Sequence, residues 1–151
     1  MFVETGTFLG DTVAALKKSC KKIVSIEIDP ALYQICLKRF ENDPNVELLL
    51  GDCIERLPRV LEMLGESAVF WLDGHWSGGA TGLGQVDDPI MISLSQIAGH
   101  TIKTHTIMID DARCFDGSNH RPDLSEVLGT LQNINRSYRI LVHHDIIVAT
   151  L

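Results

Sequence analysis

The sequence predicts an α/β protein with a doubly wound, mostly parallel sheet. Short apolar segments alternate without interruption with segments of helical periodicity, which is the pattern of a parallel sheet covered by helices on both faces. The 151 residues suit a single domain, and neither a linker nor an internal repeat divides them. The last two apolar segments flank a tight turn, so the chain is expected to end in an antiparallel hairpin.

The first half of the chain is expected to contain four strands, each leading into a helix or a loop. A short apolar strand runs from Met1 into a glycine turn, and Asp11 or Thr12 is the expected cap of the first helix. Asp29 and Pro30 mark the start of the second helix. Three further strands are expected at 22–28, 46–50 and 68–72. The inward faces of the three helices are expected to carry Val13, Leu16 and Cys20, then Leu32, Ile35, Cys36 and Phe40, then Ile54, Leu57, Leu61 and Leu64.

The second half begins with a long loop at 73–88, which contains five glycines and little periodicity. A helix is expected to start at Asp88 and Pro89, and a strand is expected at 104–109. Asp123 and Glu126 form a capping-box pattern ahead of the next helix. The terminal hairpin is expected to pair 138–143 with 146–151.

Composition restricts the partners that the sequence predicts. The net charge is −7, from 20 acidic and 13 basic residues, so no nucleic-acid partner is expected. No run approaches the roughly 20 apolar residues of a membrane span, so no membrane partner is expected either. The cysteines are scattered without a Cys-x-x-Cys pair, which favours reduced thiols in a cytoplasmic protein. They are Cys20, Cys36, Cys53 and Cys114.

Three strand ends carry the residue types of a nucleoside site. Glu4, Gly6 and Gly10 describe a glycine turn between a strand and a helix, where backbone N–H groups are left to meet a polar ligand. Glu27 ends the next apolar run, where a carboxylate can accept hydrogen bonds from both hydroxyls of a ribose. Asp52 ends the third run, where a carboxylate can meet an adenine amino group.

These residues resemble the cofactor site of class I S-adenosylmethionine-dependent methyltransferases, whose first motif is acidic-x-Gly-x-Gly-x-Gly. Phe8 stands where the middle glycine is common. A dinucleotide fold would instead need glycines where Phe8 and Asp11 stand. The resemblance implies a Rossmann-like, seven-stranded sheet with its C-terminal antiparallel hairpin. It also implies a cofactor site made of Glu4, Thr5, Gly6, Thr7 and Gly10 for the methionine portion, Glu27 and Ile28 for the ribose, and Asp52 and Cys53 for the adenine.

Three more carboxylates follow the fourth and fifth strands. Asp73, Asp110 and Asp111 should converge because neighbouring parallel strands end at one crevice, and Mg²⁺ is the ion that such a cluster favours. The pattern resembles the metal-dependent O-methyltransferases of the sugar and catechol branches. Under that resemblance Asp73 and His75 are the catalytic candidates, with His75 accepting the proton of the acceptor hydroxyl. Alternatively, Asp73 contacts the methionine end of the cofactor, Asp110 or Asp111 caps the next segment, and His75 is an exposed loop residue.

The sequence therefore predicts an S-adenosylmethionine-dependent enzyme, with Mg²⁺-dependent O-methyl transfer to a small hydroxylated acceptor such as a sugar or a phenol. Residues 1–151 are expected to be one domain without the N-terminal cover of related enzymes, and a homodimer would be one way to close the site. A non-catalytic subunit that binds the cofactor in the same fold is an alternative. A nucleotide-dependent oxidoreductase is a weaker alternative, because its glycine fingerprint is missing.

Overall fold

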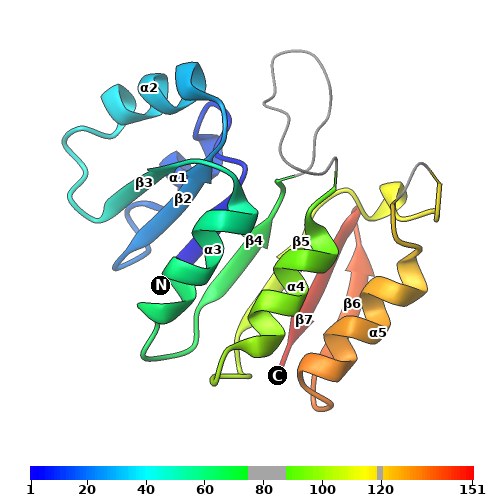
Figure 1. Ribbon diagram of the computed structural model, residues 1–151. Coiled ribbons are helices and arrows are strands. Elements are labelled where there is room, and N and C mark those ends of the chain that lie inside the picture. The colour runs from blue at the N-terminus through cyan, green and yellow to red at the C-terminus, as the bar shows by residue number, and fades with distance from the viewer. Residues whose placement is uncertain (75–87, 119–120) are drawn as a thin grey trace.

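The computed structural model describes residues 1–74, 88–118 and 121–151, and they form one seven-stranded sheet with helices on both faces (Figure 1). Across the sheet the order is β3 (Val46–Leu50), β2 (Ile23–Glu27), β1 (Phe2–Thr5), β4 (Val69–Leu72), β5 (Thr106–Ile109), β7 (Ile146–Thr150) and β6 (Arg139–His143). The switch in strand order lies between β1 and β4. In sheets of this kind, ligands bind beyond the carboxyl ends of the strands at such a switch point.

The pairing confirms the predicted fold class. In the order across the sheet, β3, β2, β1, β4 and β5 pair in parallel. In contrast, β7 runs antiparallel to both β5 and β6. The hairpin turn at His144 and Asp145 has both residues at positive φ, as a tight antiparallel connection requires. The sheet is therefore mostly parallel and ends in the expected antiparallel hairpin.

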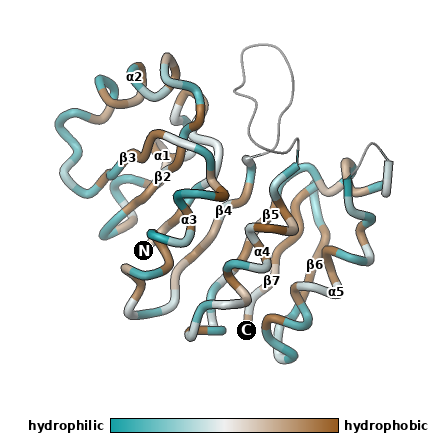
Figure 2. The backbone as a smooth tube through the Cα atoms, in the orientation of Figure 1, coloured by the Kyte–Doolittle hydropathy of each residue, from teal (hydrophilic) through white to brown (hydrophobic). Residues whose placement is uncertain are grey.

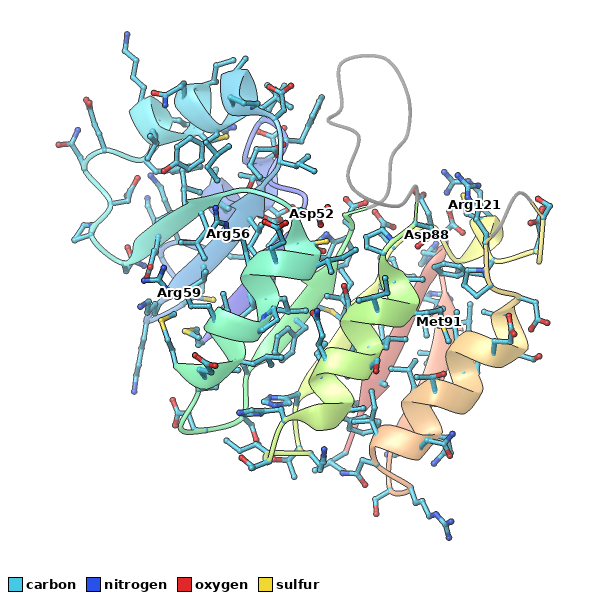
Figure 3. The ribbon with its side chains drawn as sticks, viewed as in Figure 1. Asp52, Arg56, Arg59, Asp88, Met91 and Arg121 are labelled. Atoms are coloured by element: carbon cyan, nitrogen blue, oxygen red, sulfur yellow. The ribbon has the colours of Figure 1, made fainter. Side chains whose placement is uncertain are left out.

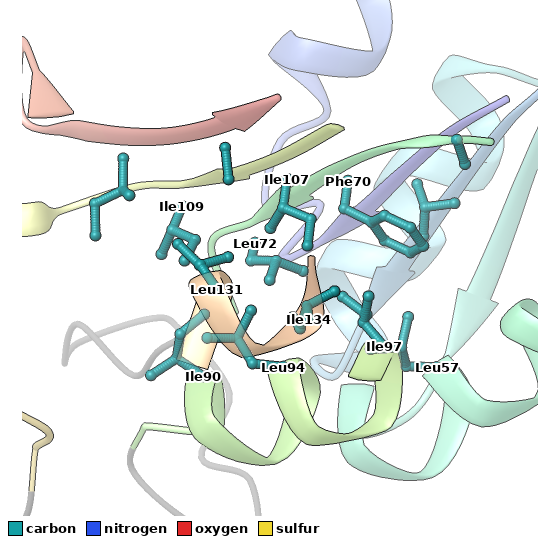
Figure 4. Close-up of a cluster of buried hydrophobic side chains, with 14 of the residues drawn as sticks. Leu57, Phe70, Leu72, Ile90, Leu94, Ile97, Ile107, Ile109, Leu131 and Ile134 are labelled. Carbon is teal, nitrogen blue, oxygen red and sulfur yellow. The ribbon is translucent and has the colours of Figure 1, made fainter. Parts of the chain in front are cut away.

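Two layers of helices cover the sheet. The helices are α1 (Asp11–Leu16), α2 (Pro30–Arg39), α3 (Cys53–Glu62), α4 (Ile90–Gly99), the short 3₁₀ turn η1 (Ala112–Cys114) and α5 (Leu124–Ile134). The larger core lies between the sheet and α3, α4 and α5, where Phe70, Leu94 and Ile107 are fully buried (Figure 4). A smaller core on the other face joins α1 and α2 to β1 and β2 through Val13 and Cys36.

Hydropathy follows this layering. Figure 2 shows the strands as mostly hydrophobic tube, with hydrophilic stretches concentrated in the helices and connections. On β4 and β5 the residues facing the larger core are buried, and the alternate residues Trp71 and Met108 pack more loosely against the smaller core. Within the described ranges, none of the helices is long and apolar enough to cross a membrane.

Several local predictions are confirmed. Asp29 caps α2 by accepting the amides of Ala31 and Leu32, at 2.8 and 2.9 Å. Asp123 and Glu126 form the complete capping box of α5. These side chains satisfy helix-end N–H groups that would otherwise lack partners, so each helix begins where the sequence placed it.

Other local predictions are wrong. Gly10, not Asp11 or Thr12, holds the cap position of α1, and it makes no side-chain capping bond. That helix ends at Leu16, so Cys20 lies beyond it. Ile35, expected on the inward face of α2, is 52% exposed, because α2 meets the sheet over the narrow strip that contains Cys36 and Phe40.

Candidate functional site

The candidate site lies along the carboxyl ends of β1, β2, β4 and β5. Figure 3 places Asp52 at the start of α3 and Asp88 just before α4, at this same edge of the sheet. The parallel strands bring Glu4, Glu27 and Asp73 to the edge from three separate parts of the sequence. The fold thus gathers the strand-end carboxylates that the sequence analysis singled out.

The turn that follows β1 requires its two glycines. Gly6 has φ +86°, and a Cβ built on it would lie 2.2 Å from the backbone oxygen of Asp73. Gly10 has φ +80°, and a Cβ there would lie 2.6 Å from the ring of Phe40. Both positions combine a left-handed backbone with a close neighbour, so only glycine fits them without displacement. The turn is therefore held tightly against the end of β4 and against α2.

Phe8 adopts a conformation that favours glycine. Its φ is 50°, and its amide donates a hydrogen bond to Oε2 of Glu27 at 2.7 Å. Its carbonyl accepts a hydrogen bond from the thiol of Cys36 at 3.1 Å. These two bonds fix the backbone, and the ring remains 49% exposed at the edge of the turn. Phe8 therefore holds a left-handed backbone conformation at the motif position where glycine is common.

Glu4 lies below the turn in a buried polar chain. The Ser25 hydroxyl donates to Oε2 of Glu4 at 2.5 Å and also lies 2.6 Å from Oγ1 of Thr7. Burial raises the pKa of Glu4 to about 7, although the hydroxyls of Ser25 and Thr12 oppose that rise. With only 1% of its surface exposed, Glu4 supports the turn from beneath. Sequence reasoning missed Ser25, whose one signal is a polar residue inside an apolar strand.

Glu27 ends β2 with both carboxylate oxygens in use. Oε2 accepts the Phe8 amide, and Oε1 accepts the Asp29 amide at 2.8 Å. The side chain is 4% exposed, and the following Ile28 is half-buried. A carboxylate has about four acceptor positions, so these bonds leave capacity for further donors. Glu27 thus ties the glycine turn to the start of α2.

Asp52 and Cys53 lie at the start of α3. Asp52 accepts the Ile54 amide at 2.9 Å and caps the helix. The thiol of Cys53 is buried, and burial with the nearby Asp52 charge raises its pKa to about 12. The thiol therefore stays protonated near neutral pH, which does not favour nucleophilic chemistry.

The carboxylate of Asp73 lies close to the negative charges of Asp110 and Asp111, which follow the neighbouring strand β5. Its pKa is raised to about 7, first by burial and then by the charges of Asp110 and Asp111. Its backbone amide donates to the carbonyl and hydroxyl oxygens of Thr5, at 3.1 and 3.2 Å. Asp110 accepts the amide of Asp111 at 2.9 Å, and Asp111 has φ 56°. The structure thus brings the three carboxylates into one electrostatic neighbourhood.

A pocket lies beside these carboxylates, between the ends of β4 and β5 and the start of α4. It is an open hollow of about 340 Å³, a volume that includes space open to solvent. Leu72, Ile109 and Phe115 provide apolar wall, and Asp88, Asp110 and Asp111 provide carboxylates. Because Thr5 and Gly74 also line it, the pocket adjoins the glycine turn. Sequence reasoning assigned no site role to Asp88 or Phe115, which reach the pocket only through the fold.

The described residues do not fit a preformed divalent-metal site. Asp111 is ion-paired with Arg113, whose Nη1 lies 2.6 Å from Oδ1 of the carboxylate. Within 1–74, 88–118 and 121–151, no three His, Cys, Asp or Glu side chains are placed to hold a metal ion. The predicted Mg²⁺ site of Asp73, Asp110 and Asp111 is therefore not supported by this part of the chain. His75, the predicted proton acceptor, lies outside the described residues.

Comparison with solved structures identifies the fold. The chain matches a methyltransferase of Podospora anserina solved with S-adenosylhomocysteine, with a TM-score of 0.61, 14% identity, and 99% of this chain and 70% of that chain covered. It matches the Methanococcus jannaschii fibrillarin pre-rRNA processing protein with a TM-score of 0.60 and 16% identity, over 98% of this chain and 64% of that one. The chain has the fold of class I S-adenosylmethionine-dependent methyltransferases.

Comparison of sequences gives a shorter match, and no family model matches the chain. A protein of Methanosarcina acetivorans named probable ribosomal RNA small subunit methyltransferase A is 32% identical over 53 residues. The match spans 35% of this chain and 20% of that protein. The chain thus spans about a fifth of the length of the curated relatives that it matches.

The prediction that this chain has no nucleic-acid partner is wrong. It rested on the net charge of −7, yet similar proteins are named for ribosomal RNA methylation and for pre-rRNA processing. Net charge describes the whole surface and says little about how charge is distributed locally at a binding face. Net charge alone therefore gives no ground for excluding a nucleic-acid partner.

Proposed function

We propose that this chain is an S-adenosylmethionine-dependent methyltransferase. The observation that carries the proposal is the bond between Glu27 and the Phe8 amide, which joins the end of β2 to the glycine turn at the switch point of a methyltransferase fold. The close packing of Gly6 and Gly10 fits a turn shaped for a ligand that approaches the backbone. The 53-residue match to a named methyltransferase supports the same class.

Residues at this edge of the sheet would each contact a different part of S-adenosylmethionine. Thr5, Thr7 and the glycines of the turn would hold the methionine portion, with Glu4 supporting them from below. Glu27, with the adjoining Ile28, would accept the ribose hydroxyls, and Asp52 and Cys53 at the start of α3 would border the adenine. When bound, the cofactor supplies a methyl group on a positively charged sulfur.

The pocket between β4, β5 and α4 would receive the acceptor. Asp73 borders this region, and its pKa of about 7 suits a group that takes a proton from an acceptor hydroxyl or amine near neutral pH. His75 stays a predicted proton acceptor. The apolar wall of Leu72, Ile109 and Phe115 would exclude water from the reacting groups. The proposed function includes no Mg²⁺-dependent step, because the guanidinium of Arg113 is paired with Asp111, one of the three predicted ligands.

Calorimetric titration with S-adenosylhomocysteine and, separately, with NAD tests the cofactor class. We expect heat with the first ligand and none with the second; binding of NAD alone would refute the proposal. Transfer of labelled methyl from S-adenosylmethionine should then be measured on ribosomal RNA fragments, sugars and phenols. Cofactor binding without transfer to any of them would favour a non-catalytic subunit.

A further inference from the structure

Arg113 lies at the edge of the sheet that carries Asp110 and Asp111. Two carboxylates hold its guanidinium in place. Its guanidinium lies 2.6 Å from Oδ1 of Asp111 and also pairs with the carboxylate of Asp145. The side chain of Arg113 is 66% exposed, whereas those of Asp111 and Asp145 are 20% and 30% exposed. The cation therefore covers the outer side of a carboxylate that lines the acceptor pocket.

The hairpin between β6 and β7 holds Arg113 in this position. Asp145 accepts the Arg113 amide on Oδ1 and the Ala112 amide on its backbone oxygen, both at 2.8 Å. Asp111 and Asp145 both have positive φ, at 56° and 66°, so each backbone is fixed in a shape that needs support. Isolated surface ion pairs contribute little, but this pair is reinforced by two backbone bonds from a second segment.

The position of Arg113 changes the charge balance of the edge. Asp110 and Asp111 line the same pocket, and Asp73 directly follows β4 beside it, so negative charge gathers at this edge of the sheet. Asp111 is already paired with the positive charge of Arg113. A divalent ion bound at Asp111 would have to displace the guanidinium or lie close to it, and like charges a few ångströms apart repel by several kcal/mol at an effective dielectric constant of about 20.

We propose that Arg113, positioned by Asp145, is the built-in cation of this site, and that methyl transfer by this chain needs no divalent metal. The proposal rests on the proposed function for the location of the acceptor pocket. Arg113 acts through Asp111 and is therefore a positioning residue. It neutralises the outermost carboxylate of the pocket.

Manganese titration of the whole chain, followed by the electron paramagnetic resonance of free Mn²⁺, tests this proposal. We expect the wild-type chain to bind Mn²⁺ more weakly than about 1 mM. Arg113→Gln should bind it at least about tenfold more tightly, because the change removes the guanidinium charge that repels a cation near Asp111. Arg113→Lys keeps the charge and should behave like the wild type, and Asp111→Asn combined with Arg113→Gln should lose the gain.

Asp145→Asn adds an independent test that leaves Arg113 in place. It weakens the hold on the guanidinium and should give part of the gain in Mn²⁺ affinity. Tight Mn²⁺ binding by the wild type, or no gain in both Arg113→Gln and Asp145→Asn, would overturn the proposal. Each protein is also titrated with S-adenosylhomocysteine. If the wild type does not bind S-adenosylhomocysteine, the proposed function is contradicted. The Mn²⁺ affinities then still test the role of Arg113 independently.

Discussion

The hydroxyl of Ser25 lies 2.5 Å from the carboxylate of Glu4, and both residues are almost fully buried. Burial favours the neutral form of this carboxylate and raises the pKa of Glu4 from 4.5 to about 7, although the bond from Ser25 opposes the rise. Its folded-state pKa lies above its unfolded-state pKa. The unfolded chain therefore loses this proton first, and the contribution of Glu4 to stability falls as pH rises from about 4.5 through 7.

Glu4→Gln should remove this loss of stability. The amide keeps an oxygen for the Ser25 hydroxyl but never ionises. We expect the variant to match the wild type near pH 4.5 and to exceed its free energy of unfolding above pH 7 by up to about 3 kcal/mol. Urea denaturation at a series of pH values measures the difference. A difference that stays constant with pH would contradict the shifted pKa.

Glu27→Ala should weaken the binding of S-adenosylhomocysteine by roughly 1–3 kcal/mol, because it removes hydrogen bonds to a charged acceptor. Glu47→Ala is the matched control, since Glu47 lies on β3 in an exposed ion pair with Lys22 and should leave affinity unchanged. Thermal melts of both variants separate lost affinity from lost folding. Unchanged affinity in Glu27→Ala would remove the ribose role from this residue.

Gly6→Ala should disrupt the turn as well as the cofactor site. Its Cβ would lie 2.2 Å from the Asp73 carbonyl oxygen, in a backbone with φ +86°. We expect a loss of stability of at least about 2 kcal/mol and no measurable cofactor binding. Gly129→Ala is the control: it lies in α5 with no atom within 4 Å of its added Cβ, and it should stabilise the chain by about 0.5–1 kcal/mol. A stable Gly6→Ala variant that still binds cofactor would show that the turn relaxes.

Much of the fold could be predicted because each element leaves its own local signal. The strands are short apolar runs, and α2 and α5 start at caps whose side chains contact residues two or three positions away. The exposure of Ile35 could not be predicted in this way. Its spacing from Cys36 and Phe40 suits an inward face, but which part of that face meets the sheet depends on how α2 packs.

The parts of the site that lie at strand ends could be predicted from the sequence. The parts that depend on contacts between residues far apart in the sequence could not. Glu4, Glu27 and Asp73 lie at or next to the carboxyl ends of parallel strands, so the topology alone brings them to one edge. The Arg113–Asp145 pair joins residues 32 positions apart, and it exists because β7 lies next to β5. No local sequence pattern predicts an ion pair between residues so far apart in the chain. The nature of the acceptor likewise could not be read from net charge.

His105 gives the opposite pH dependence at the start of β5. Its ring is fully buried, Nδ1 accepts the Ala68 amide at 3.0 Å, and Nε2 lies 3.0 Å from Nδ1 of His100. Burial lowers the pKa of His105 from 6.5 to about 4. Between these values the unfolded chain binds one more proton than the folded chain. This contribution to stability is therefore complete above about pH 6.5 and is lost as pH falls towards 4.

His105→Asn should remove this acid sensitivity, because the Asn oxygen can still accept the Ala68 amide and carries no titrating ring. Between pH 4 and 6.5 the stability of the wild type relative to the variant should rise with pH, by up to about 1.4 kcal/mol per unit. Comparing the two proteins cancels the opposing contributions of Glu4 and Asp73, whose pKa values are raised. His143→Asn, on the exposed strand β6, is the control and should keep the wild-type profile. Parallel profiles for wild type and His105→Asn would mean that the buried ring is protonated as readily in the folded chain as in the unfolded one.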